Sequence, residues 1–151
     1  MITIDELKLQ LNNKSRLIGI DMGTKRIGVS ICDENRKIAT PYETIQYNGI
    51  NNLVSKLKEI ILDNNIKGIV FGLPLNMDGT KGPSAQSVED KINLISSKLD
   101  VPIISWDERL STVGSFNLSS QLDVNVSKRV KNIDKNSATF ILQGVIDYLA
   151  K

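Results

Sequence analysis

Asp21 is the first residue whose type and surroundings could support chemistry. It ends the short apolar run Arg16-Leu-Ile-Gly-Ile-Asp21 and is followed two residues later by Gly23. A carboxylate at the end of a buried strand is held on a rigid element, and the glycine lets a phosphate or a metal ion approach the backbone. An isolated Asp-x-Gly is usually only a hairpin turn. The apolar run before it, and Lys25 and Arg26 beside it, favour a functional site.

A second pair of acids, Asp107 and Glu108, directly follows the apolar segment that ends at Trp106. Adjacent side chains point in different directions, so we expect only one of the two to reach a shared site. Arg109 could bind a phosphate. The alternative interpretation is a helix N-terminus whose acids suit the helix dipole, and the local pattern alone does not decide between the two.

A third acid, Asp134, stands at the start of the last predicted helix. Asp is a favoured N-cap residue, so a purely structural role is a strong alternative here. The chain around it is locally basic, with Lys128, Arg129, Lys131 and Lys135. Such a strip suits phosphate groups, although a run of charges is more often a solvated helix face.

The composition restricts the chemistry further. The chain of 151 residues has no histidine, which excludes Ser-His-Asp triads, Cys-His pairs and histidine metal sites. Its single cysteine, Cys32, cannot form an internal disulfide. The net charge of +2 is too small to indicate nucleic-acid binding by itself. No apolar run approaches the length of a membrane span and no signal peptide is evident, so we expect a soluble, cytoplasmic protein.

The elements that must position these acids follow from the hydrophobic pattern. Three strands over 16–21, 26–32 and 37–46, joined by polar turns, should form an antiparallel meander. Helices and strands then alternate, with expected helices over 50–61, 85–99, 110–122 and 134–149 and expected strands over 67–72 and 101–106. A polar, glycine-rich loop over 73–82 is a usual place for a ligand contact. We assign Phe71 and Trp106 to the core.

These elements predict an α/β fold with a mixed five-stranded sheet, antiparallel in strands 1–3 and parallel in strands 4 and 5, flanked by helices. Their order is that of the ribonuclease H-like fold. We expect one domain over residues 16–151, preceded by a short helical extension over residues 1–15 that begins with the capping box Thr3-Ile-Asp-Glu6. If the fourth strand lies between the first and the fifth, the Asp107-Glu108 segment must turn inward to reach Asp21.

Four segments in order also carry a family resemblance. They are Gly19-x-Asp21-x-Gly23-x-Lys25-Arg26-Ile-Gly28, Gly72-Leu-Pro-Leu-Asn-x-x-Gly79-Thr80, Asp107-Glu-Arg-Leu-Ser-Thr112 and Asp134-x-x-x-Ala138-x-x-Ile-Leu-Gln143. Together they resemble the YqgF/RuvX family, whose members are described as pre-16S ribosomal RNA nucleases or Holliday junction resolvase-like proteins with a ribonuclease H-like fold. The resemblance runs from about Arg16 to the C-terminus. Gly114, Asn136 and Ser137 depart from the family pattern, at positions that concern helix packing rather than the acids.

The resemblance implies a metal-dependent nuclease whose catalytic acids are Asp21, Glu108 and Asp134. Carboxylate oxygens suit Mg²⁺ or Mn²⁺, and we expect Asp21 to bridge two such ions, with one further acid on each. The residues expected to bind the nucleic-acid phosphates are Lys25, Arg26, Arg109, Lys128, Arg129 and Lys131. The implied partners are pre-rRNA or branched DNA and ribosomal particles, with the chain as a monomer or homodimer.

Two other functions remain open at this point. The segment Gly19-Ile-Asp-Met-Gly-Thr24 also resembles the first phosphate loop of actin-like ATP-binding proteins. Those proteins need two lobes around the nucleotide, and a chain of this length holds one. The other alternative is a non-catalytic RNA-binding factor of ribosome maturation that keeps the fold and the basic strip.

Overall fold

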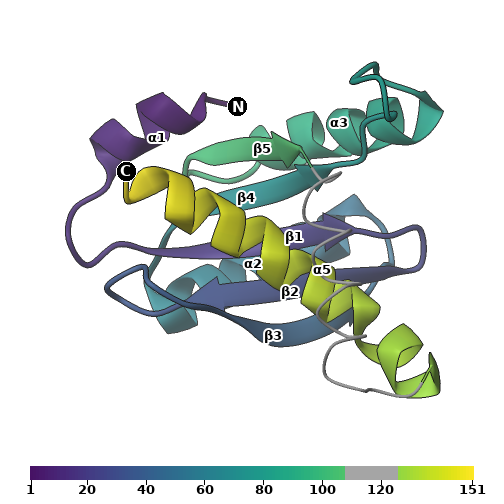
Figure 1. Cartoon of the computed structure of the whole chain (residues 1–151), viewed down its shortest axis with the longest axis horizontal. Coiled ribbons are helices and arrows are strands. Elements are labelled where there is room, and N and C mark those ends of the chain that lie inside the picture. The colour runs from purple at the N-terminus through teal and green to yellow at the C-terminus, as the bar shows by residue number, and fades with distance from the viewer. Residues whose placement is uncertain (108–125) are drawn as a thin grey trace.

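Five strands form a single sheet at the centre of the molecule (Figure 1). The computed structural model describes the backbone of residues 1–107 and 126–151, and the side chains of residues 1–107 and 137–151. The strands are β1 (Arg16–Met22), β2 (Arg26–Cys32), β3 (Ala39–Gln46), β4 (Ile66–Leu73) and β5 (Ile103–Asp107). Their order across the sheet is β3-β2-β1-β4-β5.

Strand direction changes at β1. β1, β2 and β3 pair antiparallel, whereas β4 is parallel to β1 and β5 is parallel to β4. This confirms the mixed sheet expected from the sequence. β4 does lie between β1 and β5, so the segment after β5 starts two strands away from Asp21, at about 10 Å between strand axes.

Helices cover both faces of the sheet. α2 (Ile50–Asn64) and α3 (Pro83–Ser96) pack on one face, where they bury Leu53, Leu57 and Ile92 with Ile20 and Phe71 of the strands. The other face is crossed by the long helix α5 (Val126–Leu149), with α1 (Ile4–Gln10) beside its C-terminal part (Figure 1). Each face therefore has its own apolar layer, as expected of a sheet with apolar residues on both sides.

The alternation of side chains along β1 shows which residues face which layer. Ile18 and Ile20 belong to the core under α2 and α3, and Leu17 belongs to the core under α5. Successive residues of a strand point to opposite faces, so Gly19 and Asp21 share the α5 face with Leu17. The expected core residue Phe71 is fully buried, and Trp106 packs against the α5 core, edge to face with Tyr148 at 6.2 Å between ring centroids.

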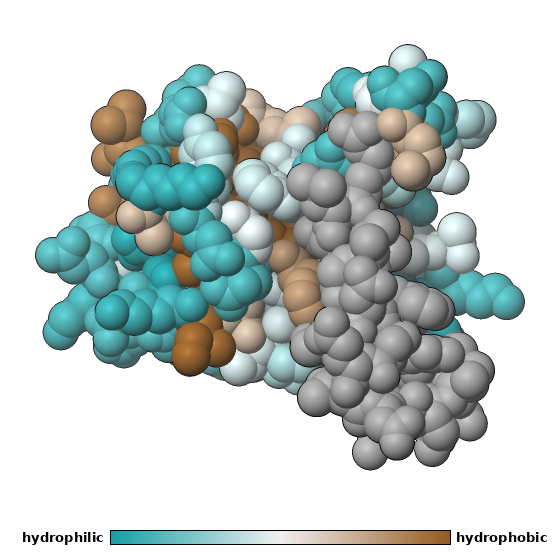
Figure 2. Space-filling view, viewed as in Figure 1, coloured by the Kyte–Doolittle hydropathy of each residue, from teal (hydrophilic) through white to brown (hydrophobic). Residues whose placement is uncertain are grey.

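The surface seen from the α5 side is mainly hydrophilic, with small, separated hydrophobic areas (Figure 2). Exposed large apolar residues such as Leu9, Leu62 and Met77 are scattered over different elements. Within the described part of the chain, no helix combines the length and the hydropathy needed to span a bilayer.

Most element boundaries lie within three residues of the expected ones, and the starts of β3 and of the last helix differ for reasons that the chain shows. β3 begins at Ala39 rather than at residue 37, because the backbone N–H groups of Lys37 and Ile38 are bound by the carboxylate of Asp33 at 2.8 and 3.0 Å. The last helix begins at Val126 rather than at Asp134, because Val126, Val130 and the apolar residues after them continue the helical spacing. The helix expected over 110–122 lies outside the described residues.

Candidate functional site

Asp21 lies near the end of β1 on the sheet face that α5 covers. In the strand register it pairs with Gly28 of β2, and Gly28 pairs with Thr44 of β3. The three residues form a row across the sheet, about 5 Å from one strand to the next. Because the middle residue has no side chain, the space between Asp21 and Thr44 is free of any side chain from β2.

The turn between β1 and β2 holds two of the predicted phosphate-binding residues. A Cβ at Gly23 would collide with the carbonyl oxygen of Arg26, and the Gly23 N–H donates to that oxygen at 3.0 Å. The carbonyl of Lys25 accepts a hydrogen bond from the Tyr47 N–H at 2.8 Å. Sterics therefore require a glycine at position 23, and hydrogen bonds hold the turn at both of its ends.

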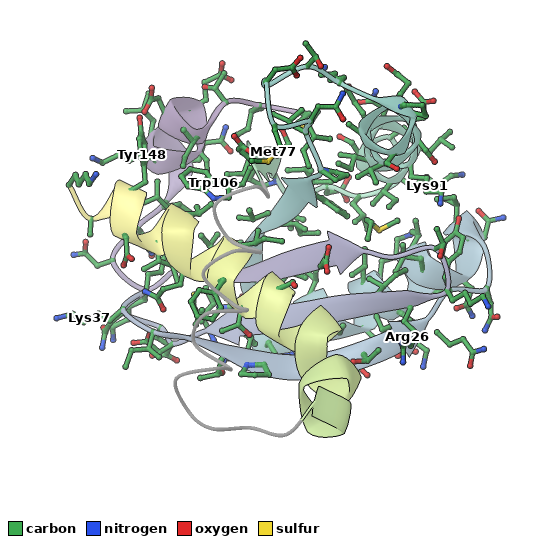
Figure 3. All side chains as sticks on the ribbon, turned by 45° about the vertical axis from the view of Figure 1, so that its right-hand side comes forward. Arg26, Lys37, Met77, Lys91, Trp106 and Tyr148 are labelled. Atoms are coloured by element: carbon green, nitrogen blue, oxygen red, sulfur yellow. The ribbon has the colours of Figure 1, made fainter. Side chains whose placement is uncertain are left out.

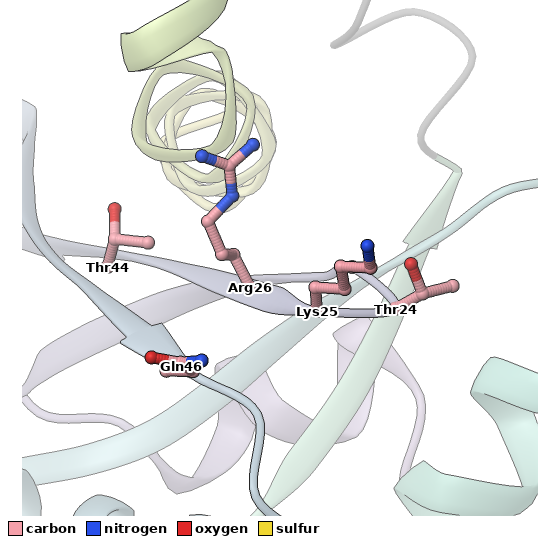
Figure 4. A pocket seen from close by; sticks show the side chains of 6 residues that line it. Thr24, Lys25, Arg26, Thr44 and Gln46 are labelled. Carbon is pink, nitrogen blue, oxygen red and sulfur yellow. The ribbon is translucent and has the colours of Figure 1, made fainter.

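A basic groove opens next to this turn. It has a volume of about 650 Å³ and is lined by Gly23, Thr24, Lys25, Arg26, Thr44 and Gln46 (Figure 4). In Figure 4 the Arg26 side chain extends toward α5. Arg26 pairs with Gln46, two residues along the strands from the Gly28–Thr44 pair and so on the same face of the sheet. The groove thus lies on the α5 face of the sheet, next to the row that contains Asp21.

Thr44 and Gln46 were not among the residues singled out from the sequence. They lie on β3, about twenty residues from Asp21 in the chain, and reach the groove only through the register of β2 and β3. The alternation of apolar and polar residues in β3 could have pointed to them. Ile45 is buried, so Thr44 and Gln46 must face the opposite side of the sheet.

Ser30 and Gly19 set how closely α5 approaches the sheet. The Ser30 hydroxyl is fully buried and donates to the carbonyl oxygen of Ala138 in α5 at 2.7 Å. A Cβ added at Gly19 would lie 2.8 Å from the same oxygen and 2.8 Å from the Cβ of Leu142. A glycine on the strand therefore permits the contact, and a serine hydroxyl fixes it. Gly19 belongs to the first of the four sequence segments, whereas Ser30 lies outside all of them.

Asp134 lies inside α5 and is not its N-cap, because the helix begins eight residues earlier. This corrects the capping interpretation of Asp134. It is one helical turn before Ala138, whose carbonyl meets Ser30. Lys128, Arg129 and Lys131 belong to the same helix. The side chains of these four residues lie outside the described part of the structure, as do Glu108 and Arg109 entirely.

Asp107, by contrast, is the last residue of β5. In this strand Ile103 packs in the core under α2 and α3, and Ile104 and Trp106 pack toward α5. Alternation assigns Asp107 to the same face as Ile103, opposite to the face that carries Asp21. Asp107 is therefore the acid of the pair that the sheet directs away from Asp21.

The donors of this chain suit a hard divalent cation. Among the described side chains, no three acids or cysteines lie close enough together to hold a metal ion. Two of the three predicted ligands, Glu108 and Asp134, lie outside that set. The single thiol, that of Cys32, is buried among apolar residues, and this burial raises its pKa. Carboxylate oxygens are thus the ligands that this region can offer, which fits Mg²⁺ or Mn²⁺.

The loop between β4 and α3 is folded on itself. The Asp78 carboxylate accepts hydrogen bonds from the backbone N–H and the hydroxyl of Thr80, at 3.0 and 2.6 Å. The Asn76 side chain also donates to the Thr80 hydroxyl at 3.1 Å, and Gly79 has a positive φ of 86°. These bonds account for the Asn-x-x-Gly-Thr pattern as the chemistry of a turn.

The sheet order, with a long C-terminal helix across the face that carries Asp21, defines a ribonuclease H-like fold. RuvC of Thermus thermophilus in complex with a Holliday junction matches with a TM-score of 0.54, covering 89% of this chain and 96% of that one at 9% identity. The fowlpox virus resolvase in complex with Holliday junction DNA matches with a TM-score of 0.56, covering 90% and 99% at 13% identity. At these identities the likeness concerns the fold.

The sequence places the chain more narrowly. The family model RuvX, described as Holliday junction resolvase, matches residues 15–148, and the chain belongs to this family. A protein of Pelagibacter ubique named "Putative pre-16S rRNA nuclease" is 63% identical over 99% of both chains. A protein of Cereibacter sphaeroides with the same name is 42% identical over 97% of this chain and 92% of that one. The family expected from the four sequence segments is confirmed.

Proposed function

We propose that this protein is a divalent-metal-dependent nuclease that hydrolyses phosphodiester bonds in structured nucleic acid. Processing of the 5′ end of pre-16S ribosomal RNA is the first candidate reaction, because relatives along almost the whole chain carry that name. Resolution of branched DNA is the second, because of the description of the family. One observation of the structure carries the proposal: Asp21 shares a sheet face with the basic groove and with the helix that contains Asp134.

Asp21, Glu108 and Asp134 would hold the cations. Asp21 and Gly19 are on the same face of β1, and Asp134 and Ala138 are one turn apart on α5. Gly19 and Ala138 are in contact. Asp21 is therefore two residues from this contact along β1, and Asp134 is four residues from it along α5. Continuing the alternation of β5 by one residue beyond Asp107 favours Glu108, rather than Asp107, for the α5 face.

In this proposal each residue has a separate task. Lys25 and Arg26, with Thr44 and Gln46, bind and orient the phosphates of the strand beside Asp21. Arg109 and the α5 residues Lys128, Arg129 and Lys131 neutralise further phosphates. When bound, a pair of divalent cations lowers the pKa of an attacking water and stabilises charge on the leaving oxygen. Contacts of this kind recognise the shape of the substrate and not its sequence.

We also propose a division of the chain into a domain and an extension. Residues 16–151 would form the nuclease domain, with residues 1–15 as an extension that packs on it. Ribosomal particles would be the setting of the reaction, and the cytoplasm its compartment. We infer this compartment from the proposed substrate.

The test is the substitution Asp21→Asn, which keeps the size of the side chain and removes its charge. We expect cleavage of a pre-16S rRNA fragment and of a four-way DNA junction, with Mn²⁺ or Mg²⁺, to fall on the order of 100-fold or more, because even outer-shell changes at metal sites cost 10–100-fold. Asp63→Asn, at an exposed site on α2, is the matched control and should cleave as the wild type does. Unchanged cleavage by Asp21→Asn would contradict the proposal. If the wild type binds RNA without cleaving it, the non-catalytic alternative holds.

A further inference from the structure

A second groove lies on the other side of the β1–β2 turn. It has a volume of about 450 Å³ and is enclosed by Gly23 and Thr24 of the turn, Pro74 after β4, and Ser84, Ser87 and Lys91 of α3. We call it the α3 groove. It shares the turn residues Gly23 and Thr24 with the basic groove, so the turn separates the two. Figure 3 shows Lys91 and Arg26 at the same end of the molecule, on different elements.

The polar groups of the α3 groove are donors suited to an anion. Ser84, Ser87 and Lys91 are spaced three and four residues apart, which puts them on one face of α3. Thr24 adds a hydroxyl from the turn, and the described residues that line the groove include no carboxylate. Of the two acids of α3, Glu89 is paired with Lys81 at 2.7 Å, and Asp90 accepts a hydrogen bond from Gln86 at 3.0 Å. The described lining of the groove is therefore electropositive.

Lys91 is held in place without an ion pair. Its ammonium lies 4.8 Å from the centroid of the Tyr47 ring, and its side chain is half-buried. Within the described part of the chain, this ammonium has no carboxylate partner. A ring orients a cation but does not neutralise it, so its charge remains available to a ligand. The start of α3 adds to this field, since Gly82 provides no side-chain cap and the first turn has no acid.

We propose that the α3 groove binds a backbone phosphate of the nucleic acid, on the far side of the β1–β2 turn from the basic groove. This inference rests on the proposed nuclease function and extends it. A substrate held in both grooves must bend or branch around the turn, because the basic groove belongs to the α5 face and α3 packs on the opposite face. The groove thereby supplies selectivity for structured substrates over a straight duplex.

The experiment measures nucleic-acid binding with EDTA present, so that cleavage does not interfere. The variants are Lys91→Gln and Lys91→Arg, with Lys98→Gln, at an exposed position after α3, as the matched control. A four-way DNA junction and a hairpin-rich pre-rRNA fragment serve as structured probes and a linear duplex as the reference. Thermal unfolding of each variant establishes that it is folded.

We expect Lys91→Gln to make the plot of log association constant against log salt concentration less steep by about one for the structured probes. Each neutralised phosphate contributes about 0.9 to the steepness of this plot. Relative to the wild type, the variant should therefore lose about ten-fold in affinity for each ten-fold decrease in salt. Lys91→Arg should restore the slope, and Lys98→Gln and the linear duplex should show little change. An unchanged slope for Lys91→Gln, with a wild type that binds the probes, overturns the inference but leaves the nuclease proposal intact. A wild type that neither binds nor cleaves overturns the nuclease proposal itself.

The phosphate could also come from a free nucleotide, and a separate arm distinguishes this source. Thermal unfolding is measured with ATP and with AMP, each with and without Mg²⁺. We expect no stabilisation, because one lobe cannot enclose a nucleotide. Stabilisation by ATP that is lost in Lys91→Gln would assign the groove to a nucleotide and overturn the assignment to nucleic acid.

Discussion

At the scale of single residues, the carboxylate of Asp33 closes the turn between β2 and β3. It accepts hydrogen bonds from the backbone N–H groups of Lys37 and Ile38, and these bonds lower its pKa below the usual carboxyl value. A carboxyl group whose pKa is lower in the folded than in the unfolded chain stabilises the fold at pH values above its pKa in the unfolded chain. That stabilisation is lost as the pH falls through the folded value.

We therefore predict that Asp33→Asn makes thermal stability depend less on pH in the acid range. The wild type should lose thermal stability as the pH falls below about 4, and the variant should lose less, because its side chain does not titrate there. Thermal midpoints between about pH 2 and pH 6 measure the difference. Glu34→Gln, at an exposed position in the same turn, is the control. Parallel curves for Asp33→Asn and the wild type would contradict the prediction.

The basic residues of α5 lead to a second prediction. Charge reversal at Lys128 and Arg129 should weaken binding of structured nucleic acid and reduce its dependence on salt, because two cations would no longer displace counterions from the phosphates. Binding titrations at several salt concentrations measure both effects. Reversal of Lys56 and Lys58, exposed on α2, is the control. An affinity equal to that of the wild type would make the strip an ordinary solvated face.

At the scale of elements, the contact between β1 and α5 decides whether the acids can meet. Gly19→Ala would place a methyl group 2.6 Å from the Ser30 hydroxyl and 2.8 Å from the Ala138 carbonyl. We predict that it destabilises the fold by about 1–3 kcal/mol, as overpacking usually does. Under the nuclease proposal it should also lower kcat, because it moves α5, and Asp134 with it, away from Asp21.

Gly144→Ala separates these two effects. Its Cβ would lie 3.1–3.3 Å from the Trp106 indole, in the same helix–sheet layer but about three turns of α5 beyond Asp134. It should lower the thermal midpoint with little change in the kcat of the folded enzyme. If the two variants lose kcat equally at equal stability, the β1–α5 contact has no special part in positioning the site.

The sequence predicted most of these elements, for identifiable reasons. The apolar runs that became β1 and β4, and the helical spacing of Leu53, Val54 and Leu57, are local signals that tertiary packing reinforced. The start of β3 was missed because a single carboxylate binds two N–H groups that would otherwise belong to the strand. The start of α5 was missed because Asp134 matches an N-cap while the true helix begins at Val126.

At the scale of the whole molecule, α1 joins the two ends of the chain. The Ile2 N–H donates to the carbonyl of Ile103 at 2.9 Å, the Lys8 ammonium to the carbonyl of Lys151 at 2.8 Å, and the Tyr148 hydroxyl to Asp5 at 3.0 Å. Leu7 is fully buried in the core under α5. The extension therefore packs against the end of α5 and against β5.

Truncation of Leu7 tests this packing. Leu7→Ala should destabilise the protein by about 2–5 kcal/mol, the usual range for a buried leucine. Leu9→Ala, on the same helix with a side chain that is 88% exposed, should change stability little. Thermal and urea unfolding measure both. Equal, small effects of the two substitutions would mean that α1 is held only loosely on the sheet.

Less of the candidate site than of the fold could be predicted from the sequence. Asp21, Lys25 and Arg26 could be singled out because they lie within one segment of six residues, and the structure brings Lys25 and Arg26 into one groove. Thr44, Gln46 and Ser30 were not, since they reach the site only through strand register and helix packing. The roles of Glu108 and Asp134 stay predictions, because their side chains lie outside the described residues.

The most direct test of the central claim is a crystal structure of the protein soaked in Mn²⁺, with the ions located by anomalous scattering. The account predicts manganese bound by carboxylate oxygens of Asp21, Glu108 and Asp134, beside the basic groove. Saturating manganese with no ion at Asp21, or these three side chains pointing away from one another, would contradict it.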